Sequence, residues 1–480
     1  MKKNLPKKIF DFKKKWQNKN VHVVGVASAE GSSILEFLVR LDFKNITAHD
    51  ISRKESLKEA YFSTHKKISG EKKKEKFIKF KNALKRTTEK FGRNYLDSIE
   101  KADLIFLSQA WFRYPENEKI YCLKKTPLWS ITKLYFDLCP GRVIGITGTL
   151  GKGTTASIIY NILKMAGTNA FFAGNESWQP QVAQNLPEFK KNDYLVLEIS
   201  NRQLMSDFSQ NPFISVITNI YPDHLDEHKN FNNYINTKFK ITSMQKKNDF
   251  LVLNYDNQIC RDFGEQTKAK VVYFSVKKDS IFSPHLKLKL SNVRSKLMAS
   301  SPLQGFHNLE NLMAASTVAK ILKIKDKEIK EAILKFTTLP GRIEFIARIH
   351  GVSYYYDIKS TTPTATTAAL KSFDQKVILI SGGEDKNLDY SSLSHEINQK
   401  VKQLIILKSS GAKKIKEKIS LKNLLETNSL FQSILQAEKN AKPGDIVLLS
   451  PSSAFFYSKF IQKKKRFIEI LASLSVKDDY

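Results

Sequence analysis

Cysteine is scarce in this sequence, and long apolar runs are missing. Three cysteines occur in 480 residues, Cys122, Cys139 and Cys260, and their positions match neither a disulfide framework nor metal-ligand spacing. No apolar stretch approaches the roughly 20 residues that a membrane-spanning helix needs. The first residues, MKKNLPKKIF, lack the apolar core of a signal peptide. These absences argue against secreted disulfide-rich and membrane-spanning classes, and they favour a reducing cytoplasm.

Acidic residues are also outnumbered, by 79 Lys and Arg to 47 Asp and Glu, which leaves a formal net charge of +32. Clustered cations of this kind mark proteins that bind nucleic acid or anionic membranes. Here lysine is spread along the chain beside abundant Ile, Phe and Asn, so a compositional bias is favoured and no nucleic-acid partner is expected. The densest run, residues 66–90, is predicted to be a solvated helical insertion. The alternative is a landing surface for an acidic partner.

Short apolar runs rich in β-branched residues alternate with helix-like stretches, which is typical of α/β folds with parallel sheets. They form three sets, and a prior of roughly 150 residues per domain also suggests three domains. Turn-forming pairs at positions 140–141 and 340–341 (Pro-Gly in both cases) precede the second and third sets. The predicted domains are residues 1–139, 140–339 and 340–480. The runs are residues 21–28, 45–50, 102–108; 142–148, 194–200, 214–220, 250–254; and 352–357, 376–383, 403–408, 445–451.

A glycine-rich segment, ITGTLGKGTTAS at residues 146–157, follows one of these runs and opens a helix-like stretch. This is the context of a phosphate-binding loop. Its glycines, Gly148, Gly151 and Gly153, allow backbone N–H groups to point at phosphate oxygens. Lys152 would lie against the terminal phosphates, and a hydroxyl from Thr154 or Thr155 would hold magnesium. The alternative is a glycine-rich turn that binds no nucleotide.

The same segment carries a family resemblance. TGTLGKGTT resembles the TGTNGKTT loop of the Mur ligases, and its extra glycine resembles the GTNGKGS loop of the folylpolyglutamate synthases, a sister branch. LEISNRQL (residues 197–204) and TNIYPDHLDEH (218–228) are similar to ELSSFQL and NxxxDHLDxH of the D-glutamate-adding Mur ligases. The resemblance implies a Rossmann-like N-terminal domain for a UDP substrate, a central P-loop ATPase-like domain and a Rossmann-like C-terminal domain for the amino acid.

The resemblance also implies a catalytic set of Lys152, Glu198, His224 and Lys238. A buried charge at a strand end, as at Glu198, needs a partner to offset its desolvation. Magnesium would be that partner, with Thr154, Glu198 and His224 as ligands, although His224 alone reads equally as a structural histidine. Lys238, in YINTKFKI, matches a family lysine that carries CO2 as a carbamate. That anion would help to hold a second magnesium ion.

Five further segments resemble family motifs in the family's order. They are AGN (173–175), GFHNLENLMAA (305–315), LPGRIEF (339–345), YDIKSTTPTAT (356–366) and GGEDKNLDY (382–390). The nucleotide contacts that the resemblance implies are Gly148, Thr149, Gly151, Lys152, Gly153, Thr154, Thr155, Asn308, Asn311, Arg342 and Asp357. The substrate contacts that it implies are Asp50, Asn175, Lys359, Thr361, Lys386 and Ser453.

Two loops depart from the family pattern. In VVGVASAEGSSILEFL (23–38), Ala27 replaces a glycine of VxGxGxSGxSxxxxL, and SQA at residues 108–110 replaces SPG. In SPSSAFFYSKF (450–460), Phe455 stands at the serine position of SPAxASFDxF. Either Ser453 takes over the role of that serine, or the amino acid accepted is not D-glutamate.

The resemblance thus implies a monomeric enzyme that joins D-glutamate to UDP-N-acetylmuramoyl-L-alanine through an acyl-phosphate, in peptidoglycan synthesis. ATP, two magnesium ions and a carbamylated lysine are the expected cofactors. A folylpolyglutamate synthase is an alternative that the extra glycine favours. A noncatalytic ATP-binding member of the family is another, which the altered loops favour. A basic nucleic-acid-binding protein would instead gather its cations on one face, among exposed aromatic residues.

Overall fold

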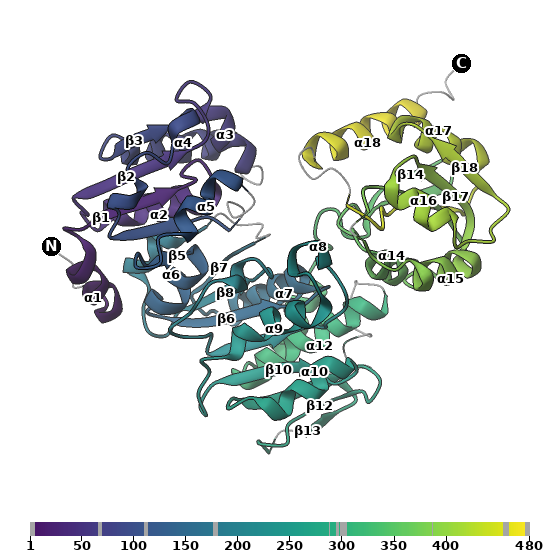
Figure 1. The fold of residues 1–480 in the computed structure, drawn as a ribbon. Coiled ribbons are helices and arrows are strands. Elements are labelled where there is room, and N and C mark those ends of the chain that lie inside the picture. The colour runs from purple at the N-terminus through teal and green to yellow at the C-terminus, as the bar shows by residue number, and fades with distance from the viewer. Residues whose placement is uncertain are drawn as a thin grey trace.

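Three sheets follow one another along the chain, and helices cover each of them (Figure 1). The computed structural model describes residues 5–65, 70–109, 114–175, 181–287, 289–293, 297, 305–385, 387–454 and 460–475. The three sheet-bearing units are arranged in a U shape, with the central unit between the N-terminal and C-terminal ones (Figure 1). The predicted α/β class with three units is confirmed.

The N-terminal sheet has five strands in the order β3-β2-β1-β4-β5, all parallel. The first strands are almost wholly buried, which explains their continuous apolar sequences. The elements are α1 (Lys7–Trp16), β1 (Asn20–Val24), α2 (Ala29–Arg40), β2 (Asn45–Asp50), α3 (Leu57–Thr64), α4 (Gly70–Leu84), β3 (Thr88–Phe91), β4 (Leu104–Leu107), α5 (Glu118–Tyr121), β5 (Leu128–Trp129) and α6 (Ile131–Leu138).

The central sheet has eight strands in the order β13-β12-β11-β10-β9-β6-β8-β7, of which β12 and β13 are antiparallel to their neighbours. Helices α7 and α12 pack on each other against its buried β-branched strands. The elements are β6 (Arg142–Thr147), α7 (Lys152–Met165), β7 (Ala170–Gly174), β8 (Tyr194–Glu198), β9 (Ile214–Ile217), α8 (Leu225–His228), α9 (Phe231–Phe239), β10 (Phe250–Asn254), α10 (Gln258–Phe263), β11 (Lys270–Ser275), β12 (Ser280–Phe282), β13 (Lys289–Ser291), α12 (Phe306–Ile321) and α13 (Asp326–Leu334).

The C-terminal sheet has six strands in the order β14-β15-β19-β16-β17-β18, with an antiparallel β14 at one edge. Its two apolar clusters lie on opposite faces, under α17 and α18 and under α14 and α15. The elements are β14 (Glu344–Ile349), β15 (Val352–Tyr356), α14 (Pro363–Leu370), β16 (Val377–Ser381), α15 (Ser391–Lys400), β17 (Val401–Leu407), α16 (Ser410–Lys416), β18 (Leu424–Thr427), α17 (Leu430–Asn440), β19 (Ile446–Leu449) and α18 (Phe460–Ser475).

The lysine-rich run is only partly the predicted solvated insertion. Residues 66–69 lie outside the described ranges, and most of the remainder forms α4. Its lysines are largely exposed, but Phe80 and Leu84 are buried and α4 packs on α2. The end of the run enters β3, which pairs with β2, so this part belongs to the domain's own sheet. The prediction was wrong there because an edge strand keeps polar residues.

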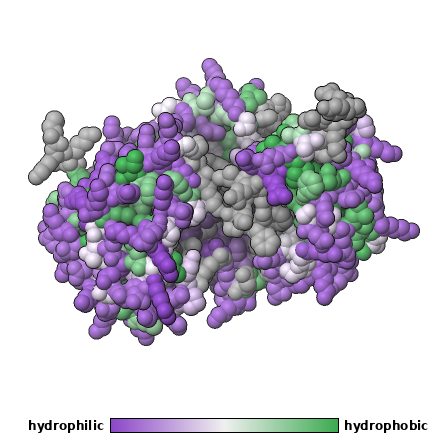
Figure 2. Space-filling view, turned by 90° about the horizontal axis from the view of Figure 1, so that it is seen from above, coloured by the Kyte–Doolittle hydropathy of each residue, from purple (hydrophilic) through white to green (hydrophobic). Residues whose placement is uncertain are grey.

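Hydrophilic residues cover most of the face seen in Figure 2, with apolar side chains in small separate groups. This distribution agrees with a lysine excess that is spread along the chain. Within the described ranges, every helix is too short or too polar to cross a bilayer.

Candidate active site

The phosphate loop lies where β6 ends at Thr147 and α7 begins at Lys152, as the sequence predicts. Gly151 adopts a φ of +81°, and a Cβ there would lie 2.1 Å from Oδ1 of Asn311. Gly148 adopts a φ of +140°, and a Cβ there would lie 2.0 Å from Oγ1 of Thr218. Both positions therefore require glycine for backbone conformation and for space.

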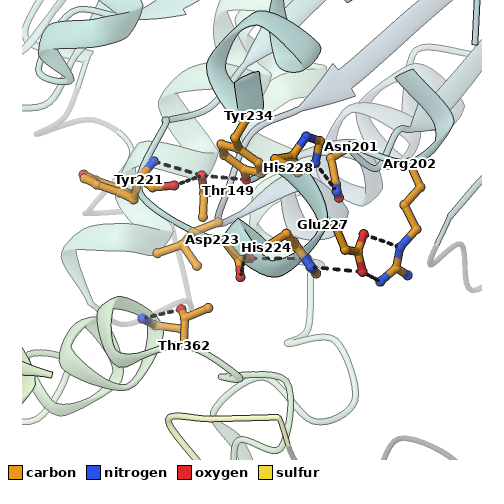
Figure 3. Close-up of polar contacts among 12 residues, drawn as sticks. Thr149, Asn201, Arg202, Tyr221, Asp223, His224, Glu227, His228, Tyr234 and Thr362 are labelled. Atoms are coloured by element: carbon orange, nitrogen blue, oxygen red, sulfur yellow. Dashed lines mark hydrogen bonds and ion pairs between the residues drawn. The ribbon is translucent and has the colours of Figure 1, made fainter. Parts of the chain in front are cut away.

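Residues after β9 hold this loop in shape. The backbone N–H of Leu150 donates to Oδ1 of Asn219 at 2.8 Å, and Oγ1 of Thr218 donates to the carbonyl of Leu150 at 2.6 Å. Thr149 accepts the backbone N–H of Tyr221 at 2.9 Å and lies 3.1 Å from the hydroxyl of Tyr234 (Figure 3). The loop is thus preorganised by bonds that need no nucleotide.

Two lysine amines meet at this loop. Nζ of Lys152 donates to the carbonyls of Gly148 and Thr149 at 3.0 and 2.9 Å, and Nζ of Lys238 donates to the carbonyl of Gly148 at 3.1 Å. Lys238 is 1% exposed. Burial, and then the charge of Lys152, hold the pKa of Lys238 well below its usual range, while Asp223 and Glu198 oppose that shift. The predicted catalytic residues Lys152, Glu198 and Lys238 are therefore brought together.

Glu198 ends β8 beside the loop and is 1% exposed. A Cβ on Gly153 would lie 3.0 Å from its Oε2, so the carboxylate faces the start of α7. Among the described residues, that Oε2 atom has no hydrogen-bond partner. A buried carboxylate oxygen left in this state fits a cation as its missing partner. No group of three or more His, Cys, Asp or Glu in the described ranges could hold a metal ion, so such a cation would need oxygen ligands of other kinds as well.

The two threonines after Gly153 have different environments. Oγ1 of Thr155 donates to Oδ1 of Asn311 at 3.1 Å, and Thr155 is fully buried. Thr154 lines the cavity beside the loop. Thr154 is therefore the better placed of the two for a magnesium ion.

His224 lies on the short helix turn after β9, with Asp223 and Glu227 on either side of it (Figure 3). Its Nε2 is 3.4 Å from Oδ2 of Asp223, and its Nδ1 is 3.9 Å from Oε1 of Glu227. Glu227 also forms an ion pair with Arg202, whose Nε donates to it at 2.8 Å. The imidazole is thus held by carboxylates, and its φ of +52° marks a sparsely populated backbone conformation.

A cavity of about 310 Å³ opens between the central and C-terminal units next to the loop. Burial raises the pKa of Asp357 to about 6, and hydrogen bonds from Ser360, Ser450 and the backbone N–H of Ile343 oppose that rise. The positive charge of Arg342 favours the ionised form of Asp357 and so lowers the pKa of that carboxyl. The predicted contacts that line the cavity are Gly151, Thr154, Asn308, Asn311, Arg342, Asp357 and Lys359.

The other predicted substrate contacts are scattered. Asp50 is buried, and its two oxygens accept the backbone N–H groups of Ala27 and Ser52 at 2.8 and 3.0 Å, so it supports the altered first loop. Ser453 is fully buried, and its hydroxyl donates to the carbonyl of Pro451 at 3.2 Å. In this structure Ser453 supports its own loop and faces no open space.

The other three predicted substrate contacts either lie apart from the cavity or fall outside the described residues. Asn175 is exposed after β7, and its backbone N–H donates to the carbonyl of Glu198 at 2.8 Å. Thr361 is half-buried, and its backbone N–H donates to the carbonyl of Lys359 at 3.0 Å. Lys386, like Phe455, lies outside the described residues.

Three residues of the site were missed from the sequence. Asn219 accepts a hydrogen bond from the phosphate loop, and the hydroxyl of Tyr234 lies beside Thr149. Asp223 lies next to the imidazole of His224, and its charge raises the pKa of Lys238. Each stands within or next to a segment singled out for another residue. A polar side chain directly after a buried strand, as at Asn219, was the available signal.

Two family models match the chain: the Mur ligase middle domain over residues 146–319, and the Mur ligase, glutamate ligase domain over residues 341–453. A UDP-N-acetylmuramoylalanine--D-glutamate ligase from Acetivibrio thermocellus is 33% identical over 97% of this chain and 99% of its own length. One from Clostridium novyi is 32% identical over 98% of this chain and 100% of its own length.

A solved pseudomurein peptide ligase type C from Methanothermus fervidus shares the fold. Its TM-score is 0.56 at 20% sequence identity, with 95% of this chain and 100% of that chain covered. The phosphate loop and both of its lysines, Lys152 and Lys238, lie within the residues that match the Mur ligase middle domain. The chain belongs to the Mur ligase family.

Proposed function

We propose that this protein uses ATP and magnesium to join D-glutamate to UDP-N-acetylmuramoyl-L-alanine in peptidoglycan synthesis. The observation that carries the proposal is the similarity to ligases of that name over 97% of the chain, which includes all three sheets. The domains are residues 1–139 for the UDP substrate, 140–339 for ATP and 340–480 for the amino acid. The protein acts as a monomer in the cytoplasm.

The reaction has two steps. The acceptor carboxylate attacks the γ-phosphorus of ATP, which gives an acyl-phosphate and ADP. The amine of D-glutamate then attacks the acyl carbon, phosphate leaves, and an amide forms. Protein groups contribute mainly by holding the reactants in line and by neutralising charge.

The residues at the phosphate loop divide this work. The loop N–H groups and Lys152 hold the phosphates, with Lys152 leaving its loop carbonyls for the nucleotide. Thr154 and Glu198 would hold magnesium, and His224 would join them as a ligand once it is released from Asp223 and Glu227. Magnesium, when bound, neutralises charge on the transferring phosphoryl group. Asn308, Asn311, Arg342 and Asp357 line the cavity that takes the nucleoside.

Lys238 carries a carbamate in the active protein. The buried amine has a lowered pKa, and the uncharged amine is the form that attacks CO2. An N–C bond forms between Nζ and the carbon of CO2, and one proton leaves. The product is an anion beside Lys152, so the carbamate and the Lys152 ammonium attract each other. This anion would help to hold a second magnesium ion.

The amino acid binds in the C-terminal domain, where Lys359, Thr361 and Lys386 offer two cations and a hydroxyl to its carboxylates. Ser453 supports the loop of that site. Asn175 faces the acceptor carboxylate from the central domain, and Asp50 shapes the loop that takes the uridine nucleotide.

Incubation with ATP, magnesium, D-glutamate and a panel of UDP-muramoyl acceptors, followed by product mass measurement, tests the proposal. We expect one new amide, formed with the L-alanyl acceptor and with ADP in equal amount. Neither ADP nor amide with any acceptor would favour a noncatalytic ATP-binding member of the family. In a parallel incubation with a folate and L-glutamate, an amide that forms there and with no UDP-muramoyl acceptor would favour the folylpolyglutamate synthase alternative, which the glycine after Lys152 supports.

A further inference from the structure

A chain of hydrogen bonds joins the N-terminal domain to Asn175. It starts at Glu30, in the first turn of α2, which is 6% exposed. Oε2 of Glu30 accepts the backbone N–H of Gln109 at 2.8 Å, and Oε1 accepts Nε2 of Gln203 at 3.1 Å. Gln109 follows β4 of the N-terminal sheet and Gln203 follows β8 of the central sheet, so one carboxylate bridges the two domains.

The chain continues through two side chains to the proposed acceptor site. The backbone N–H of Ser200 donates to Oε1 of Gln203 at 3.0 Å, and its hydroxyl donates to Oε1 of Gln109 at 2.7 Å. Nε2 of Gln109 then donates to Oδ1 of Asn175 at 3.1 Å. The backbone of Asn175 is itself bonded to Glu198, so the chain ends beside the phosphate loop.

The carboxylate of Glu30 and the backbone N–H of Ser200 together fix the direction of the first bonds, because the carboxylate only accepts and the N–H only donates. An ionised carboxylate only accepts, so Gln203 must turn its NH2 group toward Glu30 and its oxygen toward Ser200. The shorter contact of the Ser200 hydroxyl is to Gln109, which therefore presents its oxygen to Ser200 and its NH2 group to Asn175. Because the oxygen of Asn175 accepts that bond, its NH2 group is the one left to face a ligand.

We propose that Glu30 is a positioning residue, which acts through Gln203, Ser200 and Gln109 to keep the NH2 group of Asn175 directed at the acceptor carboxylate. The inference rests on the proposed function, since that function makes the acceptor a carboxylate. Without the carboxylate, the backbone N–H of Gln109 and the NH2 group of Gln203 lose their acceptor, so the amide of Gln109 is free to turn over. Asn175 would then present its oxygen, which repels a carboxylate.

Kinetics of Glu30→Gln and of Ser33→Ala test this role. Ser33 is the matched control, because it lies one turn further along α2 and also bonds across the domains, to Oε1 of Gln184 at 2.6 Å. Burial raises the pKa of Glu30 to about 7, so the assays are run at pH 8, where this carboxyl is ionised.

We expect Glu30→Gln to raise the KM for the UDP acceptor about tenfold, with kcat and the KM for ATP changed by less than about twofold. Ser33→Ala should leave the acceptor KM within about twofold of the wild type, and Glu30→Gln should add nothing in an Asn175→Ala background. If Glu30→Gln and Ser33→Ala raised the acceptor KM equally, Glu30 would only hold the two domains together, and the proposal would be overturned. Additive effects of Glu30→Gln and Asn175→Ala would also overturn the proposal.

A second measurement does not need turnover. The side-chain amide signal of Asn175 is followed by NMR in protein labelled at asparagine nitrogen, and is identified by its loss in Asn175→Ala. We expect the signal to shift in Glu30→Gln and to stay in place in Ser33→Ala. A signal that Glu30→Gln leaves unmoved overturns the inference. A wild type that forms no amide overturns the proposed function instead, and this signal still decides whether Glu30 controls Asn175.

Discussion

Two lysine amines share the carbonyl oxygen of Gly148, which no ordinary structural role explains. Burial, and then the charge of Lys152, lower the pKa of Lys238, which favours its uncharged amine. An anion added at this place, on a ligand or on a lysine, would pair with Lys152. At the scale of single residues, this pair is the observation on which the proposed carbamate of Lys238 rests.

Lys152→Ala should abolish ATP turnover and leave the fold intact, because the side chain contacts loop carbonyls and not the core. Phosphate release and the thermal unfolding midpoint are the two measurements. Lys164→Ala, an exposed lysine of the same helix, is the control and should behave as wild type. Turnover at the wild-type rate in Lys152→Ala would mean that the loop binds no phosphate.

Thr154→Ala should weaken magnesium-dependent activity more than Thr155→Ala, since only Thr154 lines the cavity. Thr155→Ala should instead lower the free energy of unfolding by about 1 kcal/mol, because the buried Oδ1 of Asn311 loses a donor. Magnesium titrations and denaturant unfolding separate the two effects. The reverse order in the magnesium titrations would place the metal on Thr155.

Lys238→Ala should lose most activity and regain part of it in a short carboxylic acid, because a diffusible anion can replace the carbamate. Lys238→Arg is the companion variant, which keeps a cation and cannot form the carbamate. Activity is measured with and without added acid. Full activity in Lys238→Arg would show that a positive charge suffices.

Strands in the interior of a sheet can be predicted from their apolar sequences, whereas strands at a sheet edge cannot. β6, β8 and β10 are predicted from the sequence because both faces of the sheet are covered and their residues are apolar. β3 was read as part of a helical insertion because TEKF has an edge strand's polar residues.

Strands β1 and β2 carry a buried histidine pair, in which Nε2 of His49 lies 2.9 Å from Nδ1 of His22. Burial lowers the pKa of each to about 4. The unfolded chain binds these protons below pH 6.5 and the folded chain does not, so stability is present above pH 6.5 and is lost as the pH falls toward 4.

Between pH 6.5 and 4 the folded state should therefore lose on the order of 2 kcal/mol for each of these histidines. His22→Gln should flatten the dependence of the unfolding midpoint on pH, whereas His395→Gln, at an exposed position of α15, should not. An unchanged slope in His22→Gln would mean that the pair does not govern acid stability.

At the scale of the whole molecule, function depends on contacts between domains that are distant in sequence. The glycine loop is predictable because its signal is local, within ten residues of one strand end. Glu30 and Gln203 are 173 positions apart, and nothing in either neighbourhood marks them as partners. Such contacts arise only when the domains dock, and sequence periodicity carries no information on that geometry.

We propose that the amino acid is chosen at this scale, when the C-terminal domain brings Lys359 and Lys386 to the carboxylates of D-glutamate. Competitive incorporation is the most direct test: the protein receives UDP-N-acetylmuramoyl-L-alanine, ATP, magnesium and an equimolar mixture of D-glutamate, L-glutamate, D-alanine and a diamino acid. The product mass and chirality should show D-glutamate, and Lys386→Ala should raise the KM for D-glutamate at least about tenfold through loss of a charged contact. A product that contains the neutral or the diamino acid, or no amide at all, would contradict the account.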